Sequence, residues 1–185
     1  MEDKKLKRRQ EIKLTISDLA FGGRGISKED DLVFFVKDAI PNQDVIAKIS
    51  KIKKNYVEAY SIETIKKSKD QVDPPCEHFE WCGGCTTQQL DYQKQLHFKQ
   101  KQISDILNKI AGEKDLDINP IIGCEQTFFY RNKMEYTFSG VPWYIGDESY
   151  DDVVIGLHVP KRFDKILNIN KCHINHEVFN DILKI

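Results

Sequence analysis

Three cysteines lie within ten residues of this chain, in the stretch CEHFEWCGGC that runs from Cys76 to Cys85. Their spacing is C-x5-C-x2-C, and two glycines separate Cys82 from Cys85. Thiolates are soft ligands that select zinc or an iron–sulfur cluster. Glycines let a loop fold around a bulky centre without side-chain clashes. The stretch therefore predicts a metal centre that takes three ligands from one loop.

A four-cysteine site needs one more ligand, and the spacing allows either Cys124 or Cys172 to supply it. Zinc remains an alternative to a cluster, although structural zinc sites usually use two close C-x2–4-C pairs and this chain has one. A set of buried free thiols is a further alternative. The spacing by itself leaves these alternatives open.

The composition fits a globular protein of one ordinary domain or two small ones, with 185 residues, 31% charged residues and a net charge of −1. No apolar run approaches the roughly 20 residues of a membrane span. The N-terminal stretch MEDKKLKRRQ lacks the apolar core of a signal peptide. We therefore expect a cytoplasmic monomer without a membrane partner. Clustered cysteines in that compartment are metal ligands or catalytic thiols more often than disulfides.

Residues 11–64 read as all-β. Ile12, Leu14 and Ile16 alternate with polar residues, and further short apolar runs follow between turns. About five short strands in so few residues predict a small barrel of the OB type, a fold that often binds nucleic acid. The glycines of FGGRG have no helix after them, so a nucleotide-binding loop is not expected.

The polar linker KKSKDQVDPP precedes the cysteines and marks a domain boundary. A helix is expected over 86–111, with Thr86 and Gln89 forming a capping box and an apolar stripe packed in a core. Alternating strands return after Pro120, which predicts an α+β central domain. The stretch NHEVFNDILKI predicts a last helix capped by Asn175 and cut short by the end of the chain.

Four segments in this order resemble the TRAM-domain RNA uracil-5-methyltransferases, which include bacterial enzymes that modify 23S rRNA. They are the barrel region, CEHFEWCGGC with TTQQLDYQKQLHFKQKQI, YRNKMEYTF, and GLHVPKRFDKILNINKCHI. The resemblance covers nearly all of residues 10–180. It implies a TRAM OB-like barrel at 9–65 and a central iron–sulfur domain at 66–185. The implied ligands of a [4Fe–4S] cluster are Cys76, Cys82, Cys85 and Cys172. Cys124 matches no ligand position and is expected to be a small core residue.

In this family a C-terminal doubly wound domain binds S-adenosylmethionine and carries a cysteine that adds to C6 of uracil. No strand, glycine-rich turn and helix for that cofactor follow the central domain here. None of the five cysteines lies in the family's catalytic segment. We therefore expect no catalytic residue in this chain, S-adenosylmethionine only in the absent domain, and no activity of the chain alone.

The barrel and the cluster domain would hold RNA, either 23S rRNA or tRNA, and no DNA. Arginine forks pair with phosphate, and lysines add point charges. The expected contacts are Arg131, Lys133, Lys161, Arg162, Arg24, Lys53 and Lys54. We expect Phe79 and Trp81 to shield the cluster, and Tyr130 and Phe138 to be core residues. His78 and His173 are expected beside the ligands.

Two other functions are alternatives to the RNA-holding part of a methyltransferase. One is a stand-alone RNA-binding protein with a structural cluster and no activity. The other is a ferredoxin-like electron carrier, which would need an exposed, reversibly reducible cluster and no affinity for RNA.

Overall fold

The computed structural model of the chain describes residues 6–112, 116–140, 143, 153–160 and 162–183. Contacts divide the chain into two compact units. The first unit contains the chain up to Val72 together with Gln89–Ile122, and the second contains Asp73–Gln88 and the chain from Gly123 onward. Neither helix in the described residues is both long enough and apolar enough to cross a bilayer.

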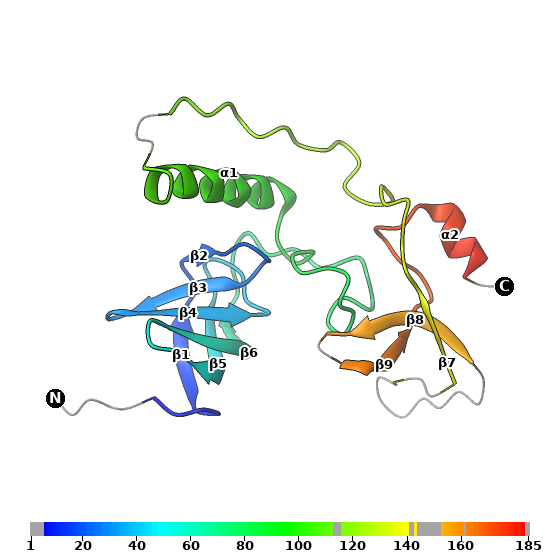
Figure 1. The fold of residues 1–185 in the computed structure, drawn as a ribbon, viewed down its shortest axis with the longest axis horizontal. Helices are drawn as coiled ribbons and strands as arrows, with labels where there is room; N and C mark the ends of the chain where they lie inside the picture. The colour runs from blue at the N-terminus through cyan, green and yellow to red at the C-terminus, as the bar shows by residue number, and fades with distance from the viewer. Residues whose placement is uncertain (1–5, 113–115, 141–142, 144–152, 161, 184–185) are drawn as a thin grey trace. The chain divides into compact units, whose positions relative to one another are not determined.

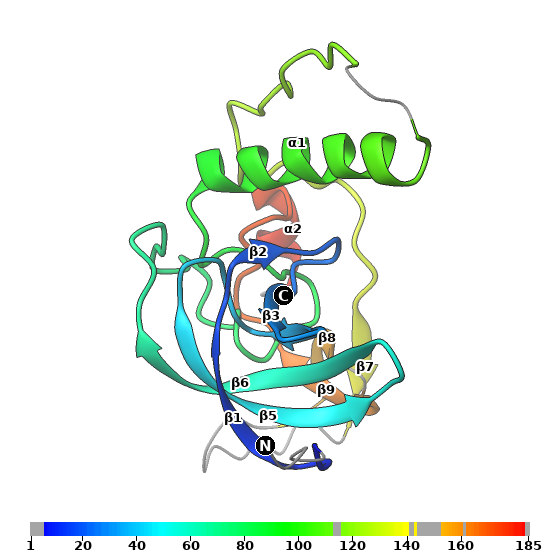
Figure 2. The ribbon, with the colours of Figure 1, turned by 90° about the vertical axis from the view of Figure 1, so that its left-hand side faces the viewer.

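The first unit contains a mixed six-stranded sheet (Figure 1). Its strands follow the order β1-β5-β6-β4-β3-β2, with β4 and β6 parallel and the other pairs antiparallel. The long strands β5 and β6 run side by side (Figure 2). The strand bounds are β1 Glu11–Thr15, β2 Asp18–Leu19, β3 Gly25–Glu29, β4 Leu32–Lys37, β5 Asp44–Ile52 and β6 Tyr56–Lys66.

The two outer strands of this sheet are one continuous piece of chain, because only Ile16 and Ser17 separate β1 from β2. In a flat sheet the outer strands of six would lie about 24 Å apart, a gap that so short a connection, reaching about 10 Å, cannot span. The Ile16 N–H donates to Gln43 O beside β5, and the Ser17 N–H donates to Ile26 O of β3. The sheet therefore closes on itself as a small barrel.

Alternation along the strands fills the barrel with apolar side chains, as the sequence predicts for half-buried strands. The buried cluster comprises Leu14, Ile16, Phe34, Val36, Ala39, Val45, Ala47, Ile49, Val57 and Ala59. Gly25 is required beside this core, because a Cβ there would lie 2.7 Å from Ile16 Cγ2 and 2.9 Å from Ala39 O.

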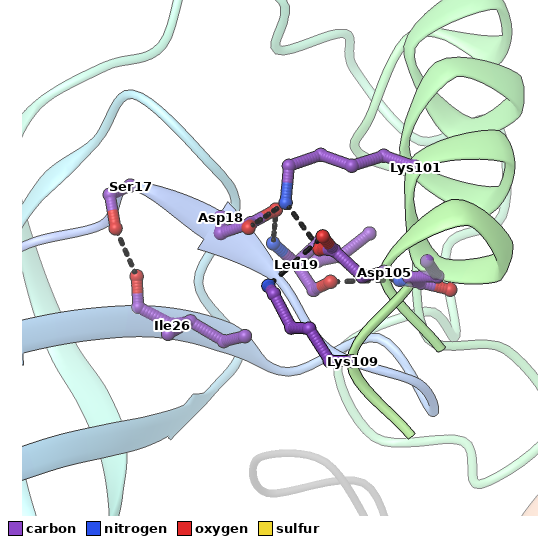
Figure 3. A network of polar contacts seen from close by, with 8 residues as sticks. Ser17, Asp18, Leu19, Ile26, Lys101, Asp105 and Lys109 are labelled. Carbon is purple, nitrogen blue, oxygen red and sulfur yellow. Dashed lines mark hydrogen bonds and ion pairs between the residues drawn. The ribbon is translucent and has the colours of Figure 1, made fainter. Parts of the chain in front are cut away.

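Helix α1 (Tyr92–Lys109) packs on the β2 side of the barrel (Figure 3). Its Phe98 joins Leu19, Ile40 and Leu90 in a second buried cluster. The Gln102 side-chain amide donates to Leu19 O at 2.8 Å. The ammonium group of Lys101 contacts the carboxylates of both Asp18 and Asp105, and Lys109 contacts Asp105. A polar network therefore surrounds the apolar contact.

The helix differs from the sequence prediction in its start and in its burial. It begins at Tyr92 and not at Thr86, because the Asp91 carboxylate accepts hydrogen bonds from the Gln93 and Lys94 N–H groups. Its apolar stripe is not core: Phe98 is buried, whereas Ile103 and Ile110 are 45% and 80% exposed. The helix also groups with the barrel in the first unit. The domain boundaries expected at 65 and 66 stay a prediction.

The second unit contains an antiparallel three-stranded sheet in the order β7-β8-β9 (Figure 1). A small buried cluster of Leu167, Ile169, Cys172 and Ile174 lies against it. The bounds are β7 Thr137–Ser139, β8 Val154–Val159, β9 Arg162–Asn168 and α2 Glu177–Ile182.

Two residues determine how β8 approaches β9 and where α2 begins. A Cβ on Gly156 would lie 1.8 Å from Leu167 O, so only glycine permits the close approach of β8 to β9. Helix α2 is capped by His176, whose Nδ1 accepts from the Val178 N–H, and not by Asn175 as the sequence suggests. Asn175 is instead fully buried, and its amide donates to the Tyr136 hydroxyl.

Candidate metal centre

Tight turns in the cysteine loop bring its thiols to one side. The Phe79 N–H donates to Cys76 O, and the Cys82 N–H donates to His78 O at 2.8 Å. The Gly84 N–H donates to Cys82 Sγ at 3.3 Å. A Cβ on Gly83 would lie 3.1 Å from His158 O, so the first glycine allows the loop to pack against the end of β8.

Cys172 reaches the same place from the segment that follows β9. Its backbone is fixed by Asn180 of α2, which accepts from the Cys172 N–H at 2.8 Å and donates to Cys172 O at 3.1 Å. Both residues are buried. The amide thus holds α2 against the residue that the family resemblance implies as the distant ligand.

The four thiols line one pocket of about 350 Å³, part of which is open to solvent. Apolar side chains complete much of its wall, among them Phe79, Met134, Leu157, Ile169 and Ile174. The remaining cysteine, Cys124, is exposed and not a core residue, which corrects the sequence prediction. Trp81 is also corrected, because it does not line the pocket, is 40% exposed and contacts the ring of Trp143.

Burial makes these thiols poor acids on their own. Desolvation raises the pKa of Cys82 to about 11 and raises the pKa values of Cys76 and Cys85. A neighbouring thiolate raises each value further, because like charges in one pocket repel. Deprotonation of several thiols together therefore requires a compensating positive centre, and metal ions provide one.

Two histidines border the pocket, as expected for residues beside the ligands. Burial lowers the pKa of His78, and its Nε2 lies 3.2 Å from the Asn170 N–H, from which it accepts a hydrogen bond in the neutral form. The pKa of His173 is also lowered by burial, and its ring packs against Phe128 and Phe129. Both imidazoles therefore belong to the wall of the pocket.

Sequence reasoning missed three polar residues of the second unit: Gln88, Tyr136 and Asn175. Gln88 lines the pocket. Burial raises the pKa of the Tyr136 hydroxyl to about 12, and the hydroxyl accepts a hydrogen bond from the Asn175 amide at 3.1 Å. The only sequence signal was the position of Tyr136 in YRNKMEY, where it reads as one member of an alternating strand.

Of the expected RNA contacts, the structure brings Arg131 and Lys133 together. Both line an open groove with Glu135 and His158, and this groove shares Gly84, Met134 and Leu157 with the thiol pocket. Tyr130 and Phe138 nearby in sequence are 59% and 72% exposed, so the interpretation of them as core residues is wrong.

Arg162 is not among the residues that line that groove. Arg162 makes a bidentate pair with Asp164, with nitrogen–oxygen distances of 2.8 and 2.6 Å. Lys161 lies outside the described residues. In the first unit Arg24 pairs with Glu58 at 3.7 Å, and Lys53 and Lys54 are exposed at the turn between β5 and β6.

No family model matches the chain. Curated relatives do, and the similarity covers most of this chain. A protein of Bacteroides thetaiotaomicron named "Uncharacterized RNA methyltransferase" is 39% identical over 170 residues, which are 89% of this chain and 37% of that protein. A Porphyromonas gingivalis protein of the same name is 34% identical over 178 residues, with 91% and 38% covered. The chain thus spans somewhat more than a third of the length of these relatives.

A solved structure has a similar fold. It is the Pyrococcus abyssi tRNA (uracil-54, C5)-methyltransferase in complex with S-adenosyl-L-homocysteine, with a TM-score of 0.57 and 21% identity. The match covers 93% of this chain and 35% of that one. Over nearly its whole length, the chain is therefore similar to a part of larger proteins named RNA methyltransferases.

Proposed function

We propose that this chain is the RNA-recognition part of an S-adenosylmethionine-dependent RNA (uracil-C5)-methyltransferase that acts on rRNA or tRNA. The observation that carries the proposal is the 39% identity, over 89% of the chain, to a protein named RNA methyltransferase. The structural neighbour, a tRNA (uracil-54, C5)-methyltransferase, supports the choice of uracil C5. Methyl transfer and S-adenosylmethionine binding would belong to a part of a longer protein outside this chain.

The closed barrel of the first unit supports a role in holding RNA. Small barrels of OB type bind single strands through a basic surface and stacked bases. The TRAM barrel of the proposal corresponds to this unit, with Arg24, Lys53 and Lys54 as its candidate phosphate contacts. Chemistry on a base in folded RNA requires that the base be extruded, so an extended grip beside the catalytic part is physically useful.

The second unit would hold a [4Fe–4S] cluster through Cys76, Cys82, Cys85 and Cys172. The fit rests on the donor set: four thiols and an apolar wall in one pocket, with the Gly84 N–H on one sulfur. Among the described residues, no three His, Cys, Asp or Glu side chains gather closely enough to hold a single ion. A cluster does not demand such a gathering, because each thiolate binds a different iron. When bound, the cluster would cross-link the loop to the segment after β9.

The groove of Arg131 and Lys133 would receive the phosphate backbone on the second unit. A guanidinium matches the fork of phosphate oxygens, and the exposed rings of Tyr130 and Phe138 offer surfaces on which bases stack. Arg162 is a weaker candidate, because its two nitrogens already bind Asp164.

The test is a binding assay with the purified chain. Fluorescence anisotropy with labelled 23S rRNA fragments and tRNA should show binding that weakens as salt rises, because phosphate contacts release counterions. Iron and acid-labile sulfide should be present at about four each per chain. No methyl group should move from radiolabelled S-adenosylmethionine to the RNA.

Three results would contradict the proposal. Absence of RNA binding at low salt would remove the recognition role. A zinc content of one per chain without sulfide would replace the cluster by a zinc site. Methyl transfer by this chain alone would show that it contains a catalytic residue.

A further inference from the structure

The outer face of the barrel carries three aromatic rings on two neighbouring strands. Phe35 lies on β4, and Tyr56 and Tyr60 lie on β6, which pairs with β4. The residues that alternate with them belong to the buried apolar cluster: Phe34, Val36, Val57 and Ala59. Successive side chains of a strand point to opposite faces, so the three rings point away from the core. All three are partly exposed, and Tyr60 is 39% exposed. These three residues are called the ring platform below.

Two rings of the platform hold each other in place. The ring centroids of Phe35 and Tyr56 are 5.6 Å apart, and the ring planes meet at 80°. Such an edge-to-face pair is a favourable aromatic geometry, so both rings are already ordered before a ligand arrives. Tyr60 lies further along β6, about 13 Å from Tyr56 along the strand. The face therefore offers flat apolar surfaces at two places on one strand.

Lysines flank Tyr60 on both neighbouring strands. Lys37 of β4 and Lys48 of β5 are its direct cross-strand partners, so the three side chains lie on one face. Lys37 contacts Asp38 at 3.1 Å, and Lys48 contacts Glu11 at 3.4 Å. Both ion pairs are partly exposed. Pairs of this kind are weak, so a phosphate can take the place of either carboxylate.

A carboxylate, that of Glu58, lies on the same face between Tyr56 and Tyr60. Arg24 of the FGGRG turn reaches it, with 3.7 Å between Nη1 and Oε2. The guanidinium offsets a negative charge that would otherwise repel phosphate. The ring platform therefore has a paired charge at its centre and lysines beside one of its rings.

The charges favour nucleic acid over protein as the occupant of this face. Interfaces between proteins are enriched in aromatic residues but depleted of lysine. Surfaces that bind single-stranded nucleic acid combine aromatic rings with basic side chains along the backbone. The lysines on both sides of Tyr60 match the second description.

We propose that the ring platform binds unpaired nucleotides of RNA, with bases stacked on Tyr60 and on the Phe35–Tyr56 pair and phosphates beside Lys37 and Lys48. The inference deepens the proposed role in RNA recognition and rests on it. An unstacked base has a free face for an aromatic side chain, whereas the bases of a duplex are already stacked on each other. The barrel would therefore select loops and other single-stranded segments.

The first experiment compares two substitutions of Tyr60 in the whole chain. Tyr60→Leu removes the aromatic face and keeps an apolar side chain, whereas Tyr60→Phe keeps the ring and is the matched control. Fluorescence anisotropy measures binding of a labelled oligouridine and of a short RNA duplex. Tyr60→Leu should weaken oligouridine binding about tenfold, and Tyr60→Phe should change it by less than about twofold. The affinity for the duplex should stay the same in both variants.

The dependence on salt separates the rings from the lysines. Tyr60→Leu should leave the slope of affinity against salt unchanged, because no phosphate contact is lost. Lys48→Gln should weaken binding of oligouridine and reduce that slope by about one. Lys48→Gln also tests the platform independently if Tyr60→Leu folds poorly, which circular dichroism would show.

The outcomes separate this inference from the proposed function. A wild-type chain that binds neither RNA overturns both. A wild-type chain that binds RNA, with the same oligouridine affinity in Tyr60→Leu or the same salt slope in Lys48→Gln, overturns only the platform. Equal losses in Tyr60→Leu and Tyr60→Phe would assign the contact to the hydroxyl, and equal losses for oligouridine and duplex would exclude stacking. Either result also overturns the platform and leaves RNA recognition to other surfaces.

Discussion

The two units keep their folds in different ways. The barrel buries ten apolar side chains in one continuous cluster. The second unit buries four in its cluster, one of them Cys172, and arranges the rest of its interior around thiols. A small unit with little apolar core needs a further cross-link, such as a disulfide or a metal. The contrast indicates that the first unit depends on hydrophobic burial, and it supports the proposal that the second unit depends on a metal centre at its thiols.

The largest loss of structure is expected from substitution of a pocket cysteine in the second unit. Cys82→Ser should lose the cluster and the ordered structure around it, because metal-binding free energy in such units is also folding free energy. Both tryptophans of the chain, Trp81 and Trp143, lie in this unit, so tryptophan fluorescence reports on it. Cys124→Ser is the control, since Cys124 is exposed and outside the pocket. A Cys82→Ser variant with native iron content and fluorescence would contradict the proposed dependence of the second unit on its thiols.

A core truncation in the barrel should have the next largest effect. Phe34 is 1% exposed, and Phe34→Ala should lower the free energy of unfolding by about 3–5 kcal/mol through lost burial and a cavity. Phe21→Ala, at a 59% exposed ring, should change it by less than about 0.5 kcal/mol. Urea unfolding followed by circular dichroism measures both. Equal effects of the two variants would mean that the barrel does not rest on its apolar cluster.

Substitutions of two arginines in the second unit would compare a groove residue with a residue already paired to a carboxylate. Arg131→Gln should weaken RNA binding about tenfold and reduce the slope of affinity against salt by about one. Arg162→Gln should do less, because Asp164 already occupies its guanidinium. Anisotropy titrations at several salt concentrations test this pair. A larger loss for Arg162→Gln would show that its pair with Asp164 opens for RNA.

The smallest effect is expected where α1 meets the barrel (Figure 3). Lys101→Met should lower the free energy of unfolding by about 1 kcal/mol at low salt, because the pair is partly exposed and screened. Lys109→Met, which loses only a more exposed contact with Asp105, should cost less. Urea unfolding of each variant gives the values.

The same network has a predictable pH dependence. Hydrogen bonds from Lys101 and Lys109 lower the pKa of Asp105 below its usual range. A lowered folded-state pKa adds stability above the unfolded value of about 3.9, and that stability is lost as the pH falls through the folded value. The difference between wild type and Lys101→Met should therefore shrink below about pH 4. A difference that stays constant down to pH 2 would contradict the assignment.

Sequence patterns predicted the barrel better than the second unit. The barrel strands show a local alternation of apolar and polar residues, whereas the second unit depends on contacts between residues far apart in the sequence. Alternation at Ile12, Leu14 and Ile16 is local, and it leads directly to half-buried strands. The start of α1 was missed because two capping signals compete, and Asp91 caps the helix in place of Thr86. A capping pattern shows that a helix can begin at a residue, but it does not show which of two signals prevails.

The thiol pocket could be predicted only in part. The three loop cysteines follow from their spacing, whereas the choice of Cys172 over Cys124 depended on the family resemblance. The position of Gln88 in the pocket wall and the contact of Tyr136 with Asn175 could not be predicted, because both depend on how distant segments of the chain meet. The exposure of Phe138 was missed because alternation does not show which face of a strand is covered: Phe138 is the middle residue of β7, and its neighbours Thr137 and Ser139 are the less exposed ones.

The connection through Ile16 and Ser17 has a consequence for how the barrel behaves at high concentration. Open sheets expose unpaired backbone groups at their outer strands, and those groups recruit further chains into fibres or swapped assemblies. Here the first and the last strand are the same stretch of backbone, and its amides bond to both neighbours. The barrel thus offers little template for growth by strand addition, and we expect it to remain dispersed at high concentration.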